Sequence, residues 1–133
     1  MLLRASNEFG ELSRAMESSL DKAGIKYIRN GTRNLAEYEI ESPVYLRIVI
    51  ESRSDPVIHN NPILPPKVTV AKGCNVDLRF SFDASRDEME RATELASSIL
   101  RETISSLGRK KPWEGLGFME SDREKKKWMN LIG

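Results

Sequence analysis

The single histidine and the single cysteine are the residues of this chain best suited to nucleophilic chemistry. A thiol becomes a strong nucleophile when a base such as imidazole lies within hydrogen-bond reach. The positions of His59 and Cys74 do not predict such a pair, because a free cysteine is usually a small buried side chain. Asp55 precedes His59 by four residues, but the flanking prolines disfavour a helix that would bring the two together. We assign no catalytic or metal-binding residue, and an enzyme acting through His59 and Cys74 is the third of our functional hypotheses.

Three glutamates, Glu37, Glu39 and Glu41, alternate along one expected strand and would lie on the same face, about 7 Å apart. Carboxylates at that distance suit acid–base chemistry or the binding of a hard cation. Arginines on neighbouring strands, such as Arg47 and Arg79, would instead pair with them on a hydrated sheet face. We favour the second interpretation.

Composition and motifs exclude several classes of protein. The 133 residues carry a formal net charge of +1, and no apolar run approaches the roughly 18 residues of a membrane span. Gly108, Gly115 and Gly117 do not match the G-x-G-x-x-G phosphate loop, so we expect no cofactor. Without an apolar run of membrane-spanning length we expect no membrane partner. A lone cysteine cannot form an internal disulfide and suits a reducing compartment, so we expect a cytoplasmic protein.

Hydrophobic periodicity divides the chain into helices and strands. Apolar residues spaced by three and four predict an N-terminal helix over residues 6–23 and a long helix over residues 86–107. The long helix begins at a capping box formed by Ser85 and Glu88. Alternation of apolar and polar residues predicts five strands, over residues 25–30, 35–42, 44–52, 67–73 and 74–83. The last two strands are expected to form a hairpin that turns at Lys72 and Gly73.

The strand predicted over residues 74–83 has the cleanest alternation in the chain. Its apolar face would carry Cys74, Val76, Leu78, Phe80 and Phe82. We therefore expect both phenylalanines in the core, not on a wet face where they would stack on RNA bases.

Residues 54–66 contain four of the six prolines and predict a loop of about a dozen residues. Pro62 to Pro65 match the P-x-x-P pattern of polyproline ligands, but a rigid connector explains the same residues. Ile63 and Leu64 lie within this pattern, and we take them as candidate contacts for a protein partner.

The C-terminal segment, residues 109–133, combines aromatic and basic residues. A second capping box at Ser121 predicts a short amphipathic helix that ends near Leu131. Its apolar residues can pack on the domain or on a protein partner, and its basic residues can contact a phosphate backbone. The candidate partner contacts here are Trp113, Phe118, Trp128 and Leu131, and the candidate nucleic-acid contacts are Lys110, Lys111, Arg123, Lys126 and Lys127.

These elements predict a single α+β domain. Strands that follow one another in the chain, with helices at the ends, favour a mostly antiparallel five-stranded sheet. We expect an N-terminal helix, the helix 86–107 packed on one face and a short C-terminal helix, in the order α-β-β-β-loop-β-β-α-α. Residues 1–108 would form the core domain, and residues 109–133 would pack on it or on a partner.

The order of elements over about residues 6–107 resembles that of type III secretion chaperone-like domains, with the Pro-rich loop in place of a helix after the third strand. The resemblance implies protein partners and a homodimer. Our leading hypothesis is a small cytoplasmic binding or adaptor protein, chaperone-like and without catalytic activity. The alternative is a nucleic-acid-associated protein that uses the basic C-terminal segment and arginines of the sheet face.

Overall fold

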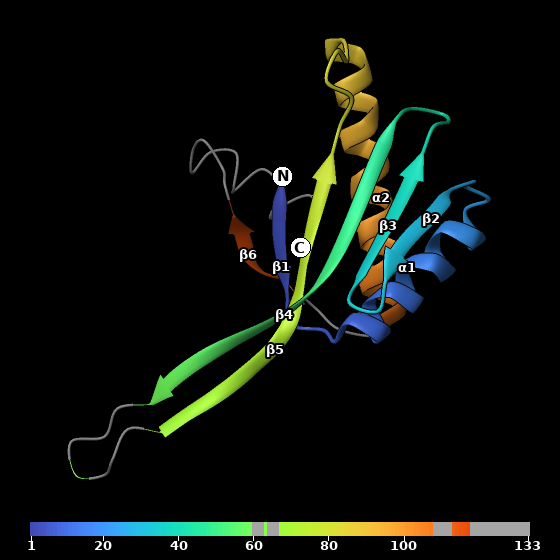
Figure 1. Ribbon diagram of the computed structural model, residues 1–133. Helices are drawn as coiled ribbons and strands as arrows, with labels where there is room; N and C mark the ends of the chain where they lie inside the picture. Colours follow the sequence, from blue (N-terminus) through green and yellow to red (C-terminus); the bar gives the residue numbers. More distant parts are fainter. Residues whose placement is uncertain (60–62, 64–66, 108–112, 118–133) are drawn as a thin grey trace.

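The computed structural model describes residues 1–59, 63, 67–107 and 113–117. These residues form one α+β domain, in which two helices cover one face of a six-stranded antiparallel sheet (Figure 1). The predicted fold class is confirmed, including the long helix packed on one face. In chain order, the elements are β1 (Leu2–Ala5), α1 (Phe9–Lys22), β2 (Ile28–Thr32), β3 (Leu35–Ile40), β4 (Leu46–His59), β5 (Lys67–Arg79), α2 (Arg86–Leu107) and β6 (Trp113–Gly117).

The strands of the described chain lie in the order β2-β3-β4-β5-β1-β6. Strands β2 to β5 follow one another as antiparallel neighbours, whereas β1 and β6 pair with each other at the far edge of the sheet. The sequence prediction missed both β1 and β6, because four or five residues carry too little alternation to be recognised. β6 lies in the C-terminal segment, residues 109–133, in which we predicted a helix but no strand.

The face of the sheet beneath the helices forms the core. α1 contributes Leu12, Met16 and Leu20, which recur every four residues on one helical face. The hydroxyl of the buried Tyr38 donates to the carbonyl oxygen of Ser13 at 3.4 Å, so the sheet and α1 also share a hydrogen bond. In β3, β4 and β5 the core residues alternate as predicted, and they are Ala36, Tyr38, Ile40, Leu46, Ile48, Ile50, Cys74, Val76 and Leu78. Leu3 and Ala5 of β1 join this core, and Val49, on the opposite face of β4, is buried as well.

The predicted cap of α2 is confirmed. The backbone N–H of Glu88 donates to Ser85 Oγ at 3.2 Å, and Ser85 Oγ donates to the Glu88 carboxylate at 3.1 Å. The backbone N–H groups of the first helical turn have no acceptor within the helix, and Ser85 Oγ supplies one for Glu88. The cap therefore determines where the helix begins.

The prediction of a hairpin turning at Lys72 and Gly73 is wrong, because β5 is one continuous strand. Gly73 lies in the middle of the strand, opposite Arg53. The strand ends at Arg79, so the expected burial of Phe82 is also wrong: this side chain is fully exposed in the connection to α2. Phe80 is partly buried and packs against the core.

β4 likewise continues through half of the segment predicted to be a loop, and it reaches His59. Pro56 lies within the strand, opposite Val70. A proline fits a strand where its nitrogen faces an unpaired edge, so its presence does not end the strand. The connection between the strands is residues 60–66, of which only Ile63 is among the described residues.

Candidate interaction site

The outer half of the β4–β5 hairpin extends well beyond the rest of the sheet (Figure 1). β3 pairs with β4 only as far as Glu51, and β1 pairs with β5 only as far as Cys74. Beyond these points β4 and β5 continue to pair with each other. We call residues 53–59 and 67–73 the β-ribbon. Its seven cross-strand pairs have no neighbouring strand on either edge within the described chain.

The β-ribbon is long, aliphatic and mildly basic. At about 3.4 Å per residue its seven pairs extend about 20 Å. Residues 53–73 contain three Lys or Arg and one Asp or Glu, whereas the rest of residues 1–107 contains eleven and fifteen. Ile63, in the connection at its tip, is 89% exposed. A two-stranded hairpin by itself is at best marginally stable in water, so a partner would stabilise this element more than any other.

Gly73 marks the root of the β-ribbon, where it leaves the sheet. A β carbon at this position would lie 2.4 Å from the carbonyl oxygen of Ala5 and 2.8 Å from Arg53 Nη2. Arg53 Nη2 donates to the same carbonyl oxygen at 3.5 Å. The guanidinium group and the β1 backbone therefore occupy the space that a larger side chain would need, and glycine is required by close approach, not by a turn.

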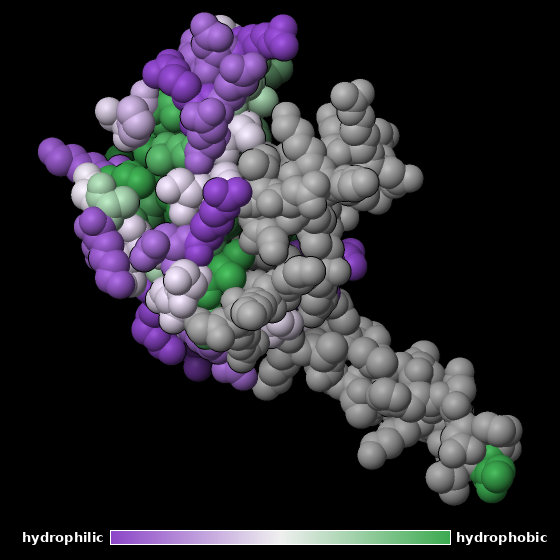
Figure 2. Space-filling view, turned by 180° about the vertical axis from the view of Figure 1, so that it is seen from behind, coloured by the Kyte–Doolittle hydropathy of each residue, from purple (hydrophilic) through white to green (hydrophobic). Residues whose placement is uncertain are grey.

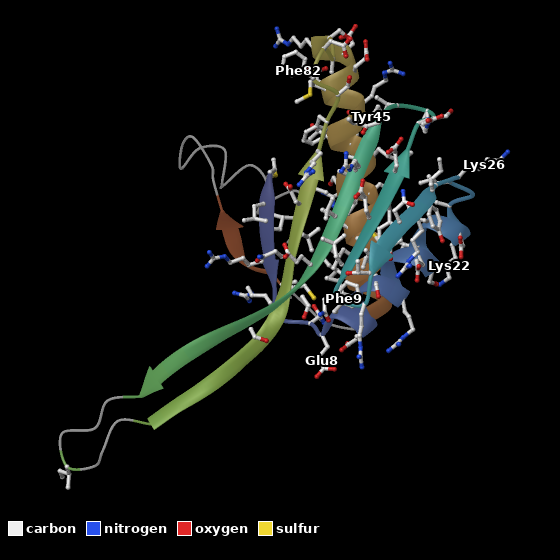
Figure 3. The ribbon with its side chains drawn as sticks, viewed as in Figure 1. Glu8, Phe9, Lys22, Lys26, Tyr45 and Phe82 are labelled. Atoms are coloured by element: carbon white, nitrogen blue, oxygen red, sulfur yellow. The ribbon has the colours of Figure 1, made fainter. Side chains whose placement is uncertain are left out.

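Cys74 and Asn7 lie next to this root. The Cys74 thiol is fully buried and donates to the carbonyl oxygen of Asn7 at 3.2 Å, and burial raises its pKa to about 11. Asn7 is 1% exposed, and among the described residues neither its amide nitrogen nor its amide oxygen has a hydrogen-bond partner. Figure 3 shows the next two residues, Glu8 and Phe9, at the end of the body from which the β-ribbon extends.

The structure does not bring His59 and Cys74 together. Cys74 pairs with Ser52, and His59 lies seven residues further along β4, which is about 24 Å at strand spacing. Because burial raises the pKa of the Cys74 thiol, the group keeps its proton at neutral pH and is a poor nucleophile. These two residues therefore do not form a nucleophile and its base.

The glutamates of β3 behave as a hydrated sheet face. Glu37 forms an ion pair with Arg47, as the favoured interpretation predicts. Arg79, in contrast, lies in β5, which is not next to β3, and it donates to Asp77 of its own strand at 2.8 Å. This hydrogen bond raises the pKa of Arg79. Glu41 lies beyond the end of β3 and is exposed. Within the described residues, no group of three or more His, Cys, Asp or Glu side chains could hold a metal ion.

A hollow of about 520 Å³ lies along α2, between Thr93 and Ser105. The residues that line it in the described chain come from this one helix and are mostly hydroxyl-bearing or charged. Figure 2 shows the same side of the molecule, where hydrophilic residues cover most of the coloured surface. A row of hydroxyl groups on one helix identifies no ligand, so the hollow does not define a site.

Two of the predicted contact residues fall among the described ones. Ile63 lies at the tip of the β-ribbon, and the backbone of Trp113 pairs with Ala5 in β6. The sequence did not reveal Asn7, Arg53 and Gly73 as the root of a projecting element. The remaining predicted contacts and the predicted helix 121–131 lie outside the described residues; these contacts are Leu64, Phe118, Trp128, Leu131, Lys110, Lys111, Arg123, Lys126 and Lys127.

The chain matches no protein-family model, no curated protein and no solved structure. The resemblance to type III secretion chaperone-like domains was based on the element order expected from the sequence. The observed order differs from that expectation, since β1 precedes α1 and β5 is a single strand. Neither of the described helices combines the length and the apolar character that crossing a bilayer requires. The β-ribbon is therefore the feature of the molecule from which we infer a function.

Proposed function

We propose that this chain is a small binding or adaptor protein without catalytic activity, and that it acts through protein–protein contacts made by the β-ribbon. The observation that carries this proposal is the extension of seven cross-strand pairs beyond the sheet, with no neighbouring strand in the described chain. Unpaired strand edges present backbone N–H and C=O groups to which a strand of another protein can add.

The residue types of the β-ribbon and its tip favour a protein as the occupant. Six large aliphatic residues fall in residues 53–73, twice the number of basic ones. Burying one Val, Leu or Ile side chain is worth about 1.5–3 kcal/mol, so a protein surface that covers several of them gains more than ion pairs on a phosphate backbone would add. The six residues are Val57, Ile58, Ile63, Leu64, Val68 and Val70.

A chaperone-like role in the cytoplasm is the specific form of this proposal. An open strand edge can hold an extended segment of a client protein through backbone hydrogen bonds, whatever the client's sequence. The free, buried thiol of Cys74 suits a reducing compartment.

A nucleic-acid partner is the second candidate, and one observation favours it. The β-ribbon is basic although the rest of residues 1–107 is acidic. The major groove of DNA is wide enough to admit a two-stranded ribbon, and basic residues on such a ribbon would contact phosphates.

A photo-reactive amino acid at position 63, compared with the same group at position 82, tests the proposal. Ile63 and Phe82 are both exposed apolar residues, and Figure 3 shows Phe82 at the end of the body opposite Glu8 and the β-ribbon. Irradiation in the native cells is expected to give discrete protein adducts from position 63 and none from position 82. Nuclease-sensitive adducts would favour the nucleic-acid candidate, and equal adducts from both positions would contradict a role for the β-ribbon.

A further inference from the structure

The two edges of the β-ribbon differ in what they offer to an added strand. Pro56 lies in the middle of the β4 edge, and a proline fits a strand only where its nitrogen faces the open side. The β4 edge therefore lacks a donor at its centre, which is one way in which natural strand edges avoid pairing. The β5 edge, residues 67–73, contains no proline and includes the β-branched residues Val68, Thr69 and Val70.

Pro56 also determines which residues of β5 direct their backbone groups toward the open edge. Two opposite residues of an antiparallel pair either exchange both hydrogen bonds or direct both sets of backbone groups away from each other. Pro56 cannot donate, so the pair that it forms with Val70 is of the second kind. The N–H and C=O groups of Val70 therefore face the open edge, and those of Val68 and Lys72 do so by the two-residue period.

We propose that the β5 edge of the β-ribbon pairs antiparallel with the same edge of a second copy of this chain, about a two-fold axis at Val70. This inference rests on the proposed protein-binding function and names its partner. Val70 would face Val70 of the other copy, Val68 would face Lys72, and Lys67 would face Gly73, so that no two lysines are opposed. The outward-facing residues would form about six backbone hydrogen bonds.

Placing the two-fold axis one residue away from Val70, at Thr69 or Ala71, would give fewer hydrogen bonds between the two β5 edges. An axis at Thr69 would place Lys72 opposite Pro66, which has no N–H to donate. An axis at Ala71 would place Val68 opposite Cys74, whose edge is already occupied by β1. Of these three positions, the axis at Val70 alone pairs all three outward-facing residues, Val68, Val70 and Lys72, with residues of the other copy's free β5 edge.

The charge distribution favours the same arrangement. Antiparallel pairing of the two edges directs the tip of each β-ribbon toward the body of the other copy. The β-ribbon carries an excess of Lys and Arg, whereas the rest of residues 1–107 carries an excess of Asp and Glu. Opposite net charges would therefore approach each other in the dimer, and this attraction would weaken as the salt concentration rises.

Two charge variants at the axis test the proposal by sedimentation velocity over a range of protein concentrations. The wild-type chain is expected to form a dimer that dissociates on dilution. Val70→Lys and Val70→Glu would each place like charges opposite one another and weaken the dimer at least tenfold. An equimolar mixture of the two variants would place opposite charges there and restore the dimer. Far-ultraviolet circular dichroism would confirm that each variant is folded.

A cysteine at the axis gives a second, independent measurement. Residues of a hydrogen-bonded antiparallel pair have Cα atoms about 5.5 Å apart, within the range that a disulfide spans. Mild oxidation of Val70→Cys is expected to give a disulfide-linked dimer on a non-reducing gel. The matched control is Val57→Cys on β4, and the wild-type chain controls for the buried Cys74. Neither is expected to link.

The results separate this inference from the proposed function. A dimer that tolerates both charge variants, or equal linking at positions 57 and 70, would overturn the β5 edge as the interface. A monomer at every concentration, with no link from Val70→Cys, would overturn a second copy as the partner. In that case, adducts from position 63 to a different protein would still support the proposed protein-binding function. The absence of any protein adduct would contradict the proposed function too.

Discussion

Gly73 lies so close to Ala5 that a β carbon at position 73 would come within 2.4 Å of the Ala5 carbonyl oxygen. Both backbones are held in place, because Ala5 pairs with Cys74 and Gly73 pairs with Arg53. Neither strand can yield without loss of ladder hydrogen bonds, so the contact leaves no room for a side chain at position 73.

Gly73→Ala is therefore expected to lower the free energy of unfolding by about 2 kcal/mol, as overpacking against fixed backbone does. Gly10→Ala is the matched control, because the nearest atom to a β carbon there is the end of the flexible Arg14 side chain, at 3.4 Å. An alanine within α1 should instead stabilise the protein by about 0.5–1 kcal/mol. Urea unfolding of both variants measures the difference, and effects of the same sign would contradict the close approach.

Burial of Cys74 predicts a loss of stability at alkaline pH. The pKa of the thiol rises from 9.0 to about 11 on folding, so between these values the unfolded chain releases a proton that the folded chain retains. The free energy of unfolding must then fall as the pH rises, by about 1 kcal/mol at pH 10 from this group alone. Tyr38, whose pKa burial raises to about 12, acts in the same direction above pH 10.

The measurement is urea unfolding of wild type and Cys74→Ala at several values between pH 7.5 and 10. The substitution leaves a cavity and lowers stability at every pH. Its specific effect is a shallower decline above pH 9, because the buried thiol no longer contributes. Parallel curves for the two proteins would show that the thiol does not titrate as its burial predicts.

The buried face of the sheet could be predicted from the sequence because it depends on local pattern. Residues 36–40 and 46–50 alternate with a period of two, and their alternation continues through Val76 and Leu78, so the core strands and the helix that covers them follow directly. The start of α2 could also be predicted from the sequence, because its capping box involves residues only three positions apart. In each of these elements the physical cause lies within a few residues of its effect.

The β-ribbon could not be predicted, because its causes lie far apart in the chain. Pro56 ends a strand in most contexts, and only the pairing with Val70 shows that its nitrogen faces an open edge. In the sequence, Gly73 looks like a turn residue. Only the fold shows that the Ala5 backbone, 68 residues earlier in the chain, is the reason for a glycine there. The N-terminal strand itself has four residues, and it is stable because β5 and β6 flank it, not because of its own alternation.

The cap of α2 gives a further prediction. Ser85→Ala removes the oxygen that accepts from the Glu88 N–H at 3.2 Å, and it should lower the free energy of unfolding by about 1 kcal/mol. Ser105→Ala is the control, since Ser105 is an exposed residue within the same helix and alanine has the higher helix propensity. Thermal unfolding followed by circular dichroism would measure both. A decrease for Ser105→Ala as large as that for Ser85→Ala would argue against the cap.

Asn7 and Thr103 are both buried polar residues, but within the described residues only Thr103 is hydrogen-bonded through its side chain. Thr103 Oγ1 donates to the carbonyl oxygen of Ile99 at 2.7 Å and lies 3.2 Å from Ser19 Oγ. In the part of the chain that the structure describes, neither polar atom of the Asn7 side-chain amide has a hydrogen-bond partner. A buried polar group without a partner costs about 1–3 kcal/mol, and an apolar replacement of similar size removes that cost.

Asn7→Leu is therefore expected to raise the free energy of unfolding by about 1 kcal/mol, whereas Thr103→Val should lower it by about the same amount. The backbone carbonyl of Asn7, which accepts from Cys74, is unchanged by the substitution, so the root of the β-ribbon keeps that contact. Urea unfolding at neutral pH would give both values. If Asn7→Leu were as destabilising as Thr103→Val, the Asn7 amide would have to be hydrogen-bonded in solution, and the root of the β-ribbon would be a polar contact point.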